Sequence, residues 1–460
     1  MTMVRFHNYK VDSISSGDIY KVQFHLSGVH PSLANALRRT LLSGIPIVGF
    51  DDNYEEHNID IRKNVSALHN EFVAHRLSLL PICMYRNTSL KITVSHDGND
   101  FVYRFANKET VPNFLLRVKN DAETRLALGA NPDNTIDITS AHIKIENAED
   151  YNPVEEFMIS DYITGDYCLI HRLKPISSNE EVQEAEELDI TMIPTIGTAK
   201  IHARYCPVGT VSYEFQKDTL DAQSRNFEDY METLQRQRAY DKLAPFNEND
   251  IAIFKGSFDV MGSERVYRRN QFGEPDTVMF CVESVGNLEA HQLVLDAINM
   301  IRLRTVALLN FFHWEKSKYV TDEKKIAVSK NKESGYIEIR ISGEDHTLGN
   351  LIASYLKKLF VTDRKLGDHL TFATYRAPHP LKDEIVVVIG IKSDMNTLFT
   401  QNGLRPTSRQ EDAAIQCLIM ACKEYMGQLN KLESDWKSLT GLQATSFEID
   451  RENSQFRSQV

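Results

Sequence analysis

The stretch GVHPSLANALRRTLLSGIP, residues 28–46, has a counterpart at residues 343–360, which read GEDHTLGNLIASYLKKLF. Both stretches begin with Gly and carry Leu, a small residue and Asn at the same offsets. These triplets are Leu33-Ala34-Asn35 and Leu348-Gly349-Asn350. A pattern that recurs within one chain indicates a repeated structural unit.

The first copy carries the signals of a short amphipathic helix. Leu37 and Leu41 follow Leu33 at helical spacing, Pro31 suits a first helical turn, and Gly44 with Pro46 ends the pattern. The repeat therefore predicts one helix of the same kind in each half of the chain.

The elements around the two copies follow one order. Residues 4–27 alternate polar and apolar side chains about a turn at Ser15–Asp18, which predicts a β-hairpin before the first helix. In the second half we expect strands at 336–342, 370–376 and 384–391, with the helix at 347–360. Each half then ends in a long helix with an apolar stripe. The stripe of the first long helix contains Val294, Ile298 and Ile301. The second long helix is expected at about 410–438, and its stripe contains Leu418 and Tyr425.

These patterns predict an α+β protein with two related dimerisation modules. The first module comprises residues 1–50 and 273–318, and a mixed, β-rich insert at 51–272 interrupts it. Residues 319–334 are expected to form a linker, 335–438 the second module, and 439–460 a polar tail. The insert contains an acidic stretch at 177–189, which we interpret as a solvated loop without assigned function.

Repetition of an amphipathic helix predicts that each module has an apolar face that it cannot cover alone. Packing of the two modules would bury both faces, and covalent linkage lowers the cost of association. The expected architecture is an intramolecular pseudo-dimer held by its helices.

The composition excludes several classes of protein. The chain has 460 residues, 42% of them apolar and 25% charged, as an ordinary globular protein with more than one core would have. Its net charge of −12 argues against a free nucleic-acid binding module, which we keep as a weaker alternative. Neither a membrane-spanning run nor a signal peptide is evident, so we expect an intracellular protein without membrane contact.

No residue pattern predicts catalysis, a metal or a cofactor. The cysteines Cys83, Cys168, Cys206, Cys281, Cys417 and Cys422 form no C-x-x-C pair. His202 and Cys206 could be drawn as the base and nucleophile of a thiol hydrolase, a second alternative, but HARYC reads as a short extended run. The acids of DDNYEEHNID (51–60) are expected to form a solvated turn.

Two polar features of the repeated helices call for an explanation. Asn is a mediocre helix former, so Asn35 and Asn350 are expected to tie each helix to a neighbouring loop. The second copy has Ala353-Ser354 at the positions equivalent to Arg38-Arg39, so the arginines should serve the first half alone. Such a pair is ordinarily a solvated surface, and the alternative is a clamp on a partner's carboxylates.

At these residues the sequence resembles a known family, the assembly-platform subunits of multisubunit DNA-dependent RNA polymerases. LANALRRTLLSGIP is similar to the signature of the bacterial alpha subunit and of the third-largest eukaryotic subunit. Segments 68–82 (LHNEFVAHRLSLLPI), 199–215 (AKIHARYCPVGTVSYEF) and 282–288 (VESVGNL) resemble further parts of that third-largest subunit, in the same order.

The second half resembles the small partner of that subunit, the eukaryotic eleventh or archaeal L subunit. The resemblance lies in EDHTLGNLIASYL (344–356), which includes His346, and in TFATYRAPHPLKDEIVVVI (371–389). His379 and Pro380 in the latter are expected to form a turn at the subunit interface. The two subunits are separate chains in cellular organisms, so their fusion resembles large DNA viruses that carry their own polymerase.

The resemblance implies a non-catalytic subunit that recruits the large catalytic subunits. The implied partners are the second-largest (β-like) and largest (β′-like) subunits and small subunits similar to the tenth and twelfth, with DNA bound only through the complex. One arginine of Arg38-Arg39 would face the β-like subunit, and the motif residues Asn35 and Asn350 would be structural. A viral source would imply packaging in the virion and action in the host cytoplasm or nucleus.

One departure from the family concerns zinc. Many relatives of the third-largest subunit carry a cysteine-rich zinc loop in the insert, whereas MYRNTSLKITVSHDGNDF (84–101) contains no cysteine. We therefore predict that the chain binds no zinc.

Overall fold

A computed structural model of the chain describes most of its 460 residues. The residues outside the description are 1–3, 14–16, 54–55, 98–99, 132, 147–153, 162, 176–184, 315–324, 364, 393–395, 402–406, 408 and 451–460. Most of the acidic stretch at 177–189 falls among them, so its expected solvation stays a prediction. Among the residues that are described, no helix combines the length and the apolarity that a bilayer span requires.

The first module is a four-stranded antiparallel sheet with two helices. The sheet has the order β1-β2-β14-β13, with β1 (Arg5–Ser13), β2 (Ile19–Ser27), β13 (Val208–Phe215) and β14 (Thr277–Ser284). Helix α1 (Pro31–Ser43) follows β2, and the long helix α7 (Ala290–Trp314) follows β14. The predicted hairpin, the start of α1 at Pro31 and its end at Gly44 are confirmed.

The second module repeats this plan with its own four-stranded antiparallel sheet. Its order is β15-β16-β18-β17, with β15 (Ile326–Lys330), β16 (Ile337–Ser342), β17 (Leu370–Arg376) and β18 (Glu384–Ile391). The helices are α8 (His346–Lys357), which continues into the π-helical turn η8 (Lys358–Thr362), the short α9 (Asn396–Gln401) and the long α10 (Gln410–Thr440).

The predicted linker at 319–334 is wrong where the structure describes it. Residues 326–330 form β15, which pairs with β16. The polar stretch NKESG (331–335) is the turn of this hairpin, because Asn331 N–H donates to Tyr336 O (2.8 Å) and Gly335 N–H donates to Asn331 O (2.9 Å). Polar residues and glycine suit a hairpin turn as well as a linker, so the sequence alone did not distinguish them. We propose that the second module begins near residue 325.

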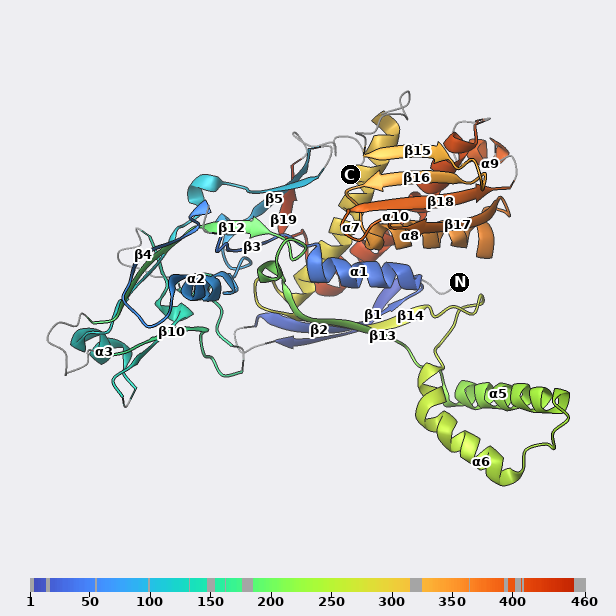
Figure 1. Cartoon of the computed structure of the whole chain (residues 1–460), viewed down its shortest axis with the longest axis horizontal. Helices are drawn as coiled ribbons and strands as arrows, with labels where there is room; N and C mark the ends of the chain where they lie inside the picture. The colour runs from blue at the N-terminus through green and yellow to red at the C-terminus, as the bar shows by residue number, and fades with distance from the viewer. Residues whose placement is uncertain are drawn as a thin grey trace.

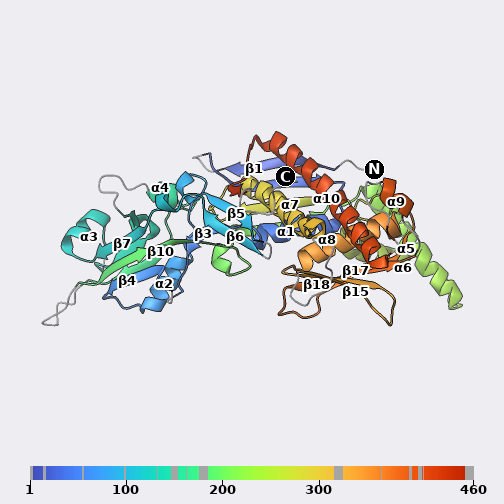
Figure 2. The same ribbon diagram turned by 90° about the horizontal axis from the view of Figure 1, so that it is seen from above.

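Four helices hold the two modules together. Helix α1 packs on α7 and α8, and α10 packs on α7 and α8, so helices of both modules share one core. Figure 2 shows these four helices gathered between the sheets. All the apolar residues predicted for the helix faces are buried there, namely Leu33, Leu37, Leu41, Val294, Ile298, Ile301, Leu348, Leu418 and Tyr425.

The insert is a β-rich part at one end of the molecule (Figure 1). Its sheets are β4-β11-β7-β9, β10-β8 and β12-β3, formed by β3 (Ile47–Phe50), β4 (Ile59–Asn64), β7 (Phe114–Lys119), β8 (Ile136–Thr139), β9 (Lys144–Ile145), β10 (Leu169–Leu173), β11 (Glu187–Met192) and β12 (Pro194–Gly197). Short helices connect them: α2 (Asn70–Ser78), α3 (Ala122–Leu128), α4 (Val154–Phe157) and the 3-10 turns η2 (Thr88–Leu90), η3 (Lys108–Thr110), η4 (Ser140–His142) and η5 (Ala203–Tyr205).

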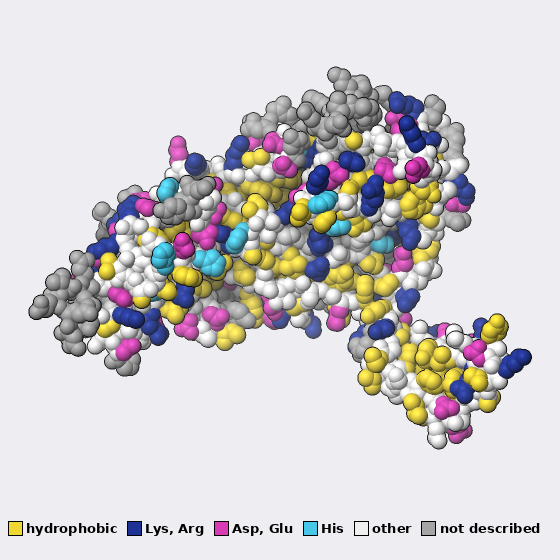
Figure 3. All heavy atoms as spheres, viewed as in Figure 1, with side chains coloured by type: hydrophobic (Ala, Val, Ile, Leu, Met, Phe, Trp, Pro, Cys, Tyr) yellow, Lys and Arg dark blue, Asp and Glu magenta, His cyan; other side chains and the backbone are white. Residues whose placement is uncertain are grey.

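The structure differs from the single insert expected at 51–272. Strand β13 lies inside that range but pairs with β14 in the sheet of the first module, from Val208↔Ser284 to Phe215↔Val278, with one register shift between Val208 and Thr210. The connection from β13 to β14 holds a second, separate insertion, helices α5 (Leu220–Tyr240) and α6 (Glu248–Ser257), followed by the π-helical turn η6 (Phe258–Gly262) and the 3-10 turn η7 (Ser263–Arg265). We propose two insert segments, 51–193 and 216–276. Figure 3 shows the helical segment as a lobe apart from the body.

The predicted polar tail at 439–460 is also structured in its described part. After α10, residues Phe447–Ile449 form β19, which adds in parallel to β5 (Ile92–His96), itself paired with β6 (Phe101–Phe105). A strand of three residues in a polar context carries almost no sequence signal, which is why it was missed. The last described strand therefore completes a sheet in the insert.

Candidate partner interface at the junction of the two modules

The two repeated helices begin with side-chain caps. In α1 the imidazole Nδ1 of His30 accepts a hydrogen bond from Ser32 N–H (3.1 Å), and in α8 Oδ1 of Asp345 accepts from Thr347 N–H (2.8 Å). Capping satisfies backbone donors that the first helical turn leaves free. Both helices therefore start three residues after the glycine that opens each repeat, and the start of α8 meets the C-terminal half of α1, where Arg39 contacts Thr347.

The small residue of the motif is required by close packing. A Cβ added to Gly349 would lie 2.5 Å from Cδ2 of Tyr375 in β17, so the ring covers the helix backbone at this point. The first copy has Ala34 here, which is completely buried. The Tyr375 hydroxyl lies 3.2 Å from Nδ1 of His346 in the first turn of α8.

The asparagines of the motif do not tie their helices to loops, contrary to the prediction. Asn35 Oδ1 accepts two hydrogen bonds from Arg38, from Nε and Nη2 at 3.1 Å each. Asn350 Oδ1 accepts from the Ser354 hydroxyl (3.4 Å). Both contacts lie within one helix, because the asparagines occupy its half-buried edge one turn before their partners. Asn35 thus orients Arg38.

Arg39 joins the two modules, which the sequence did not predict. Its Nε donates to the Thr347 hydroxyl of α8 at 2.8 Å. The prediction that the arginine pair serves the first half alone is therefore wrong for Arg39. In the described part of the chain neither Arg38 nor Arg39 forms an ion pair, so both half-buried guanidinium groups keep donors for an acceptor from outside.

An ion pair beneath Arg39 also connects the modules. Arg304 of α7 contacts Glu344 (2.6 Å) and Asp345 (3.3 Å) at the start of α8, and its side chain is 18% exposed. Burial alone would raise the pKa of Asp345, but the charge of Arg304 and the hydrogen bonds from Thr347 lower it to about 2. The two acids raise the pKa of the Arg304 guanidinium further above its ordinary value, against the effect of burial.

Sequence reasoning missed Arg304 as a site residue. The sequence shows Arg304 as an arginine within the apolar pattern of α7. It does not show the partners of this arginine, because only the fold brings Glu344 and Asp345 next to it. A second pair, Arg302 with Glu433 of α10 (3.3 Å), follows the same logic.

A cavity of about 440 Å³ lies between the modules beside Arg39. Arg39, Thr40 and Arg304 of the first module and Asp345 and Thr347 of the second line it. At its rim Lys200 contacts Asp383 of the second module (2.8 Å). The junction is thus a polar cleft above an apolar helix core.

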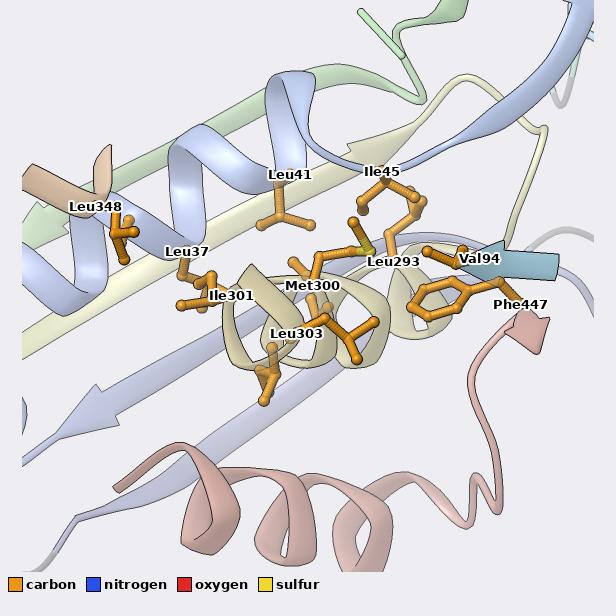
Figure 4. Packing of buried hydrophobic residues seen from close by; sticks show 14 of the residues in the cluster. Leu37, Leu41, Ile45, Val94, Leu293, Met300, Ile301, Leu303, Leu348 and Phe447 are labelled. Carbon is orange, nitrogen blue, oxygen red and sulfur yellow. The ribbon is translucent and has the colours of Figure 1, made fainter. Parts of the chain in front are cut away.

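The helix core below this cleft is continuous across the modules. Figure 4 shows Leu37 and Leu41 of α1 directed toward Ile301 and Met300 of α7, with Leu348 of α8 in the same cluster. Deeper in the core, the hydroxyls of Thr305 in α7 and Tyr425 in α10 are 3.1 Å apart.

The structure places His379 and Pro380 in the exposed turn between β17 and β18. Leu381 N–H donates to Nδ1 of His379 (3.1 Å), so this histidine takes part in the turn. Its contact with the first half runs through the neighbouring Asp383 and Lys200, not through His379 itself. A role of the turn in binding other subunits stays a prediction.

The alternative thiol site is not assembled. Cys206 Sγ lies 3.3 Å from Val208 O and 3.5 Å from Leu42 O, whereas Nδ1 of His202 accepts from Arg204 N–H (3.2 Å). HARYC is not extended, because residues 203–205 form η5.

The first acids of DDNYEEHNID bind Arg204, including Asp51 at 3.1 Å, so these acids anchor a buried arginine and are not simply solvated. Within the described ranges, no group of three or more His, Cys, Asp or Glu side chains could hold a metal ion, and the expected absence of zinc stays a prediction.

The fold and the junction define a chain of two linked dimerisation modules, packed as two subunits of an assembly would be. The chain belongs to the RNA polymerase Rpb3/Rpb11 dimerisation domain family, whose models match residues 23–303 and, separately, 336–435. It is therefore a fused Rpb3/Rpb11-like subunit, as the repeat and the resemblance predicted, with an α+β fold and a β-rich insert.

Its relatives carry the names of two different polymerase subunits. The chain is 26% identical over 329 residues to DNA-directed RNA polymerases II, IV and V subunit 3 of Arabidopsis thaliana, a match that covers 67% of this chain and 92% of the relative. It is 23% identical over 296 residues to DNA-directed RNA polymerase II subunit rpb3 of Dictyostelium discoideum, covering 61% and 87%. It is 49% identical over 65 residues to DNA-directed RNA polymerase subunit Rpo11 of Metallosphaera sedula, covering 14% and 62%.

Proposed function

We propose that this chain is the non-catalytic assembly platform of a DNA-directed RNA polymerase. One observation carries the proposal: two Rpb3/Rpb11 dimerisation domains occur in a single chain and pack through their repeated helices. The names of the relatives support it, since both kinds are polymerase subunits. In this role the chain positions the largest and second-largest subunits, which perform nucleotidyl transfer, and meets DNA only within the complex.

The outer edge of α1 is the proposed contact with the second-largest subunit. Asn35 holds Arg38 through Nε and Nη2, and Thr347 holds Arg39 through Nε. Each guanidinium is thereby oriented while part of its donor fork stays available, which suits a bidentate bond to a carboxylate. Because Thr347 belongs to the second module, Arg39 has this orientation only when the two modules are packed together.

Small subunits similar to the tenth and twelfth eukaryotic subunits are further proposed partners. A viral source and packaging in a virion follow from the fusion by analogy alone and are expectations. An intracellular place of action agrees with the polymerase subunits among the relatives.

The proposal is tested by capture of the purified β-like subunit on the full-length chain. Loss of a charged contact at a protein interface costs about 2–5 kcal/mol, so Arg38→Glu should weaken binding by roughly thirtyfold or more. Arg39→Glu should weaken it similarly and also loosen the junction at Thr347. Arg236→Glu is the matched control, because that exposed arginine pairs with Glu232 within α5, away from α1. Unchanged capture by both α1 variants would refute the assignment of this surface, and failure of the wild-type chain to bind either large subunit would refute the function.

A further inference from the structure

The helical segment between β13 and β14 is a separable unit, here called the arm and defined as residues 219–265. Its two ends meet, since Asp218 N–H donates to Val266 O (2.9 Å) and Lys217 pairs with Tyr267 as an isolated bridge. Figure 1 shows α5 and α6 extending away from both modules. The arm therefore adds nothing to the shared helix core, and its presence needs another explanation.

The arm has only a small core of its own. Phe258 contacts Phe227 and Tyr230, with ring centroids 5.3 and 6.3 Å apart, and Phe246 contacts Phe254 at 5.0 Å. Of the described side chains in α5 and α6, Met231 alone is buried. Two helices with so little buried area are marginal in water, because most helical stability in proteins comes from packing.

The outer face of α6 and η6, defined as Ile253 of α6 with Val260 and Met261 of η6, is apolar and exposed. These side chains are 70%, 74% and 64% exposed, although Phe258 of η6 already packs on Phe227 of α5. Figure 3 shows hydrophobic side chains gathered over this lobe. A helix with apolar residues on both faces indicates a second contact surface, since single exposed apolar residues are common but clusters mark interaction sites.

The charges around this face select among possible occupants. From Glu248 to Gly262 the segment carries three acids, Glu248, Asp250 and Asp259, and the single base Lys255. Two nearby arginines of α5 are engaged within the arm, because Arg236 pairs with Glu232 and Arg238 lies over the Phe246 ring. Nucleic acid and anionic membranes both require basic residues on the binding face, and a second copy would bring like charges together.

We propose that the outer face of α6 and η6 docks a further protein of the assembled polymerase, one that presents an apolar patch bordered by lysines and arginines. This inference rests on the proposed function for its setting, but not on the α1 contact. The partner's apolar side chains cover Ile253, Val260 and Met261, and its basic rim meets Asp250 and Asp259. The arm thus provides a binding site that the two modules lack.

Hydrogen–deuterium exchange tests the proposal on the intact chain, free and within the purified polymerase. We expect residues 248–262 to exchange at least about tenfold more slowly in the polymerase, as burial at an interface requires. The double variant Ile253→Glu/Val260→Glu should abolish this slowing and remove one component from the complex by native mass spectrometry, with both large subunits retained. Leu126→Glu in α3, which is 89% exposed, is the matched control and should change neither result.

A charge-reversal variant and a deletion of the arm test the same docking surface independently. Asp250→Lys/Asp259→Lys should weaken the same component by about tenfold if the rim contact is real. Replacement of residues 219–265 by Gly-Gly-Ser, which the meeting ends allow, should reproduce the loss if the glutamate variant misfolds. Equal exchange in both states, protection in the free chain that rises with its concentration, or binding to phosphatidylcholine–phosphatidylserine vesicles would overturn the proposal. Absence of the large subunits from the wild-type complex would instead count against the proposed function.

Discussion

The two repeated helices differ in the residue that caps them, His30 in α1 and Asp345 in α8. The leucines of the motif could be predicted from their spacing, because periodicity reports which face of a helix is buried. The polar contacts could not, since Arg39–Thr347 and Arg304–Glu344 join residues that only the tertiary fold brings together. The single-helix contacts of Asn35 and Asn350 were mispredicted for a related reason, because an amide at a helix edge has several partners in reach.

The His30 cap predicts a dependence of stability on pH. Burial, the largest cause, and the nearby Lys358 and Lys357 lower the pKa of His30 from 6.5 to about 4, against the effect of Glu274. The folded state therefore binds fewer protons than the unfolded state between these values. The contribution of His30 is complete above pH 6.5 and is lost as the pH falls toward 4, by about 3 kcal/mol in total.

His30→Asn tests this dependence, because asparagine also caps helices but does not titrate. Between about pH 7 and pH 4.5 the free energy of unfolding, measured with urea, should fall by roughly 2–3 kcal/mol more in the wild type than in the variant. Parallel pH profiles of the wild type and the variant would contradict the prediction, because they would show that the His30 imidazole titrates alike in the folded and unfolded states.

At the scale of elements, helices were easier to predict than strands. The long helices α7 and α10 carry apolar stripes over several turns, and the structure has both. Strands β13, β15 and β19 were assigned to an insert, a linker and a tail, because their partners lie far away in sequence or beyond a polar turn. The helices of the arm were assigned to the mixed, β-rich insert, since much of their surface is polar and their core is small.

Strand β19 belongs to a segment, residues 442–450, that fastens the insert to the helix core. Ser446 N–H donates to the buried Asp296 of α7 (3.0 Å), and Phe447 is 3% exposed beside Val94 and Leu293 (Figure 4). Burial raises the pKa of Asp296 to about 6, although the hydrogen bonds from Ser446 and Gln292 oppose the shift. Without this segment, the buried carboxyl group would keep only the hydrogen bond from Gln292 (2.9 Å) among the described residues.

Phe447→Ala should destabilise the chain by about 3–5 kcal/mol, because it leaves a cavity between β5 and α7. Urea unfolding monitored by tryptophan fluorescence would measure the change, and amide exchange should accelerate selectively in β5. Glu448→Ala is the control, since its carboxylate is half exposed and pairs with Lys91 at the surface, worth at most about 1 kcal/mol. A loss no larger than that of the control would mean that the segment is not integral to the core.

At the scale of the whole molecule, the sequence repeat was sufficient to predict a pseudo-dimer. Two copies of one helix imply two similar apolar faces, and α1, α7, α8 and α10 bury these faces against one another. The position of the insert and the separation of the arm were beyond prediction, because they depend on which strands pair. The two family matches lie in the two parts of this one chain, at residues 23–303 and 336–435, and its relatives include proteins named subunit 3 and proteins named Rpo11.

Such a core should survive cleavage of the connection between the modules. Two fragments, produced together and divided within residues 315–324, should co-purify as a one-to-one complex, because the buried helix faces are the same as in the intact chain. Size-exclusion chromatography with light scattering would detect it.

The variant Arg304→Glu should weaken this reassociation by at least about a hundredfold, since it places a third acid beside Glu344 and Asp345. Arg236→Glu in the arm is the control. Fragments that elute separately would indicate that the covalent link, and not the helix core, holds the modules together.

The pairing of β19 with β5 also determines when, during synthesis of the chain, the sheet of the insert can be completed. About 350 residues separate the two strands, so at 5–20 residues per second a ribosome needs roughly 20–70 s to make the second after the first. During that interval the open edge of β5 is exposed in a nascent chain whose first module is already emerging. Completion of the sheet thus reports that α10 and the whole second module have been synthesised, and the insert becomes fully structured only in a chain that carries both modules.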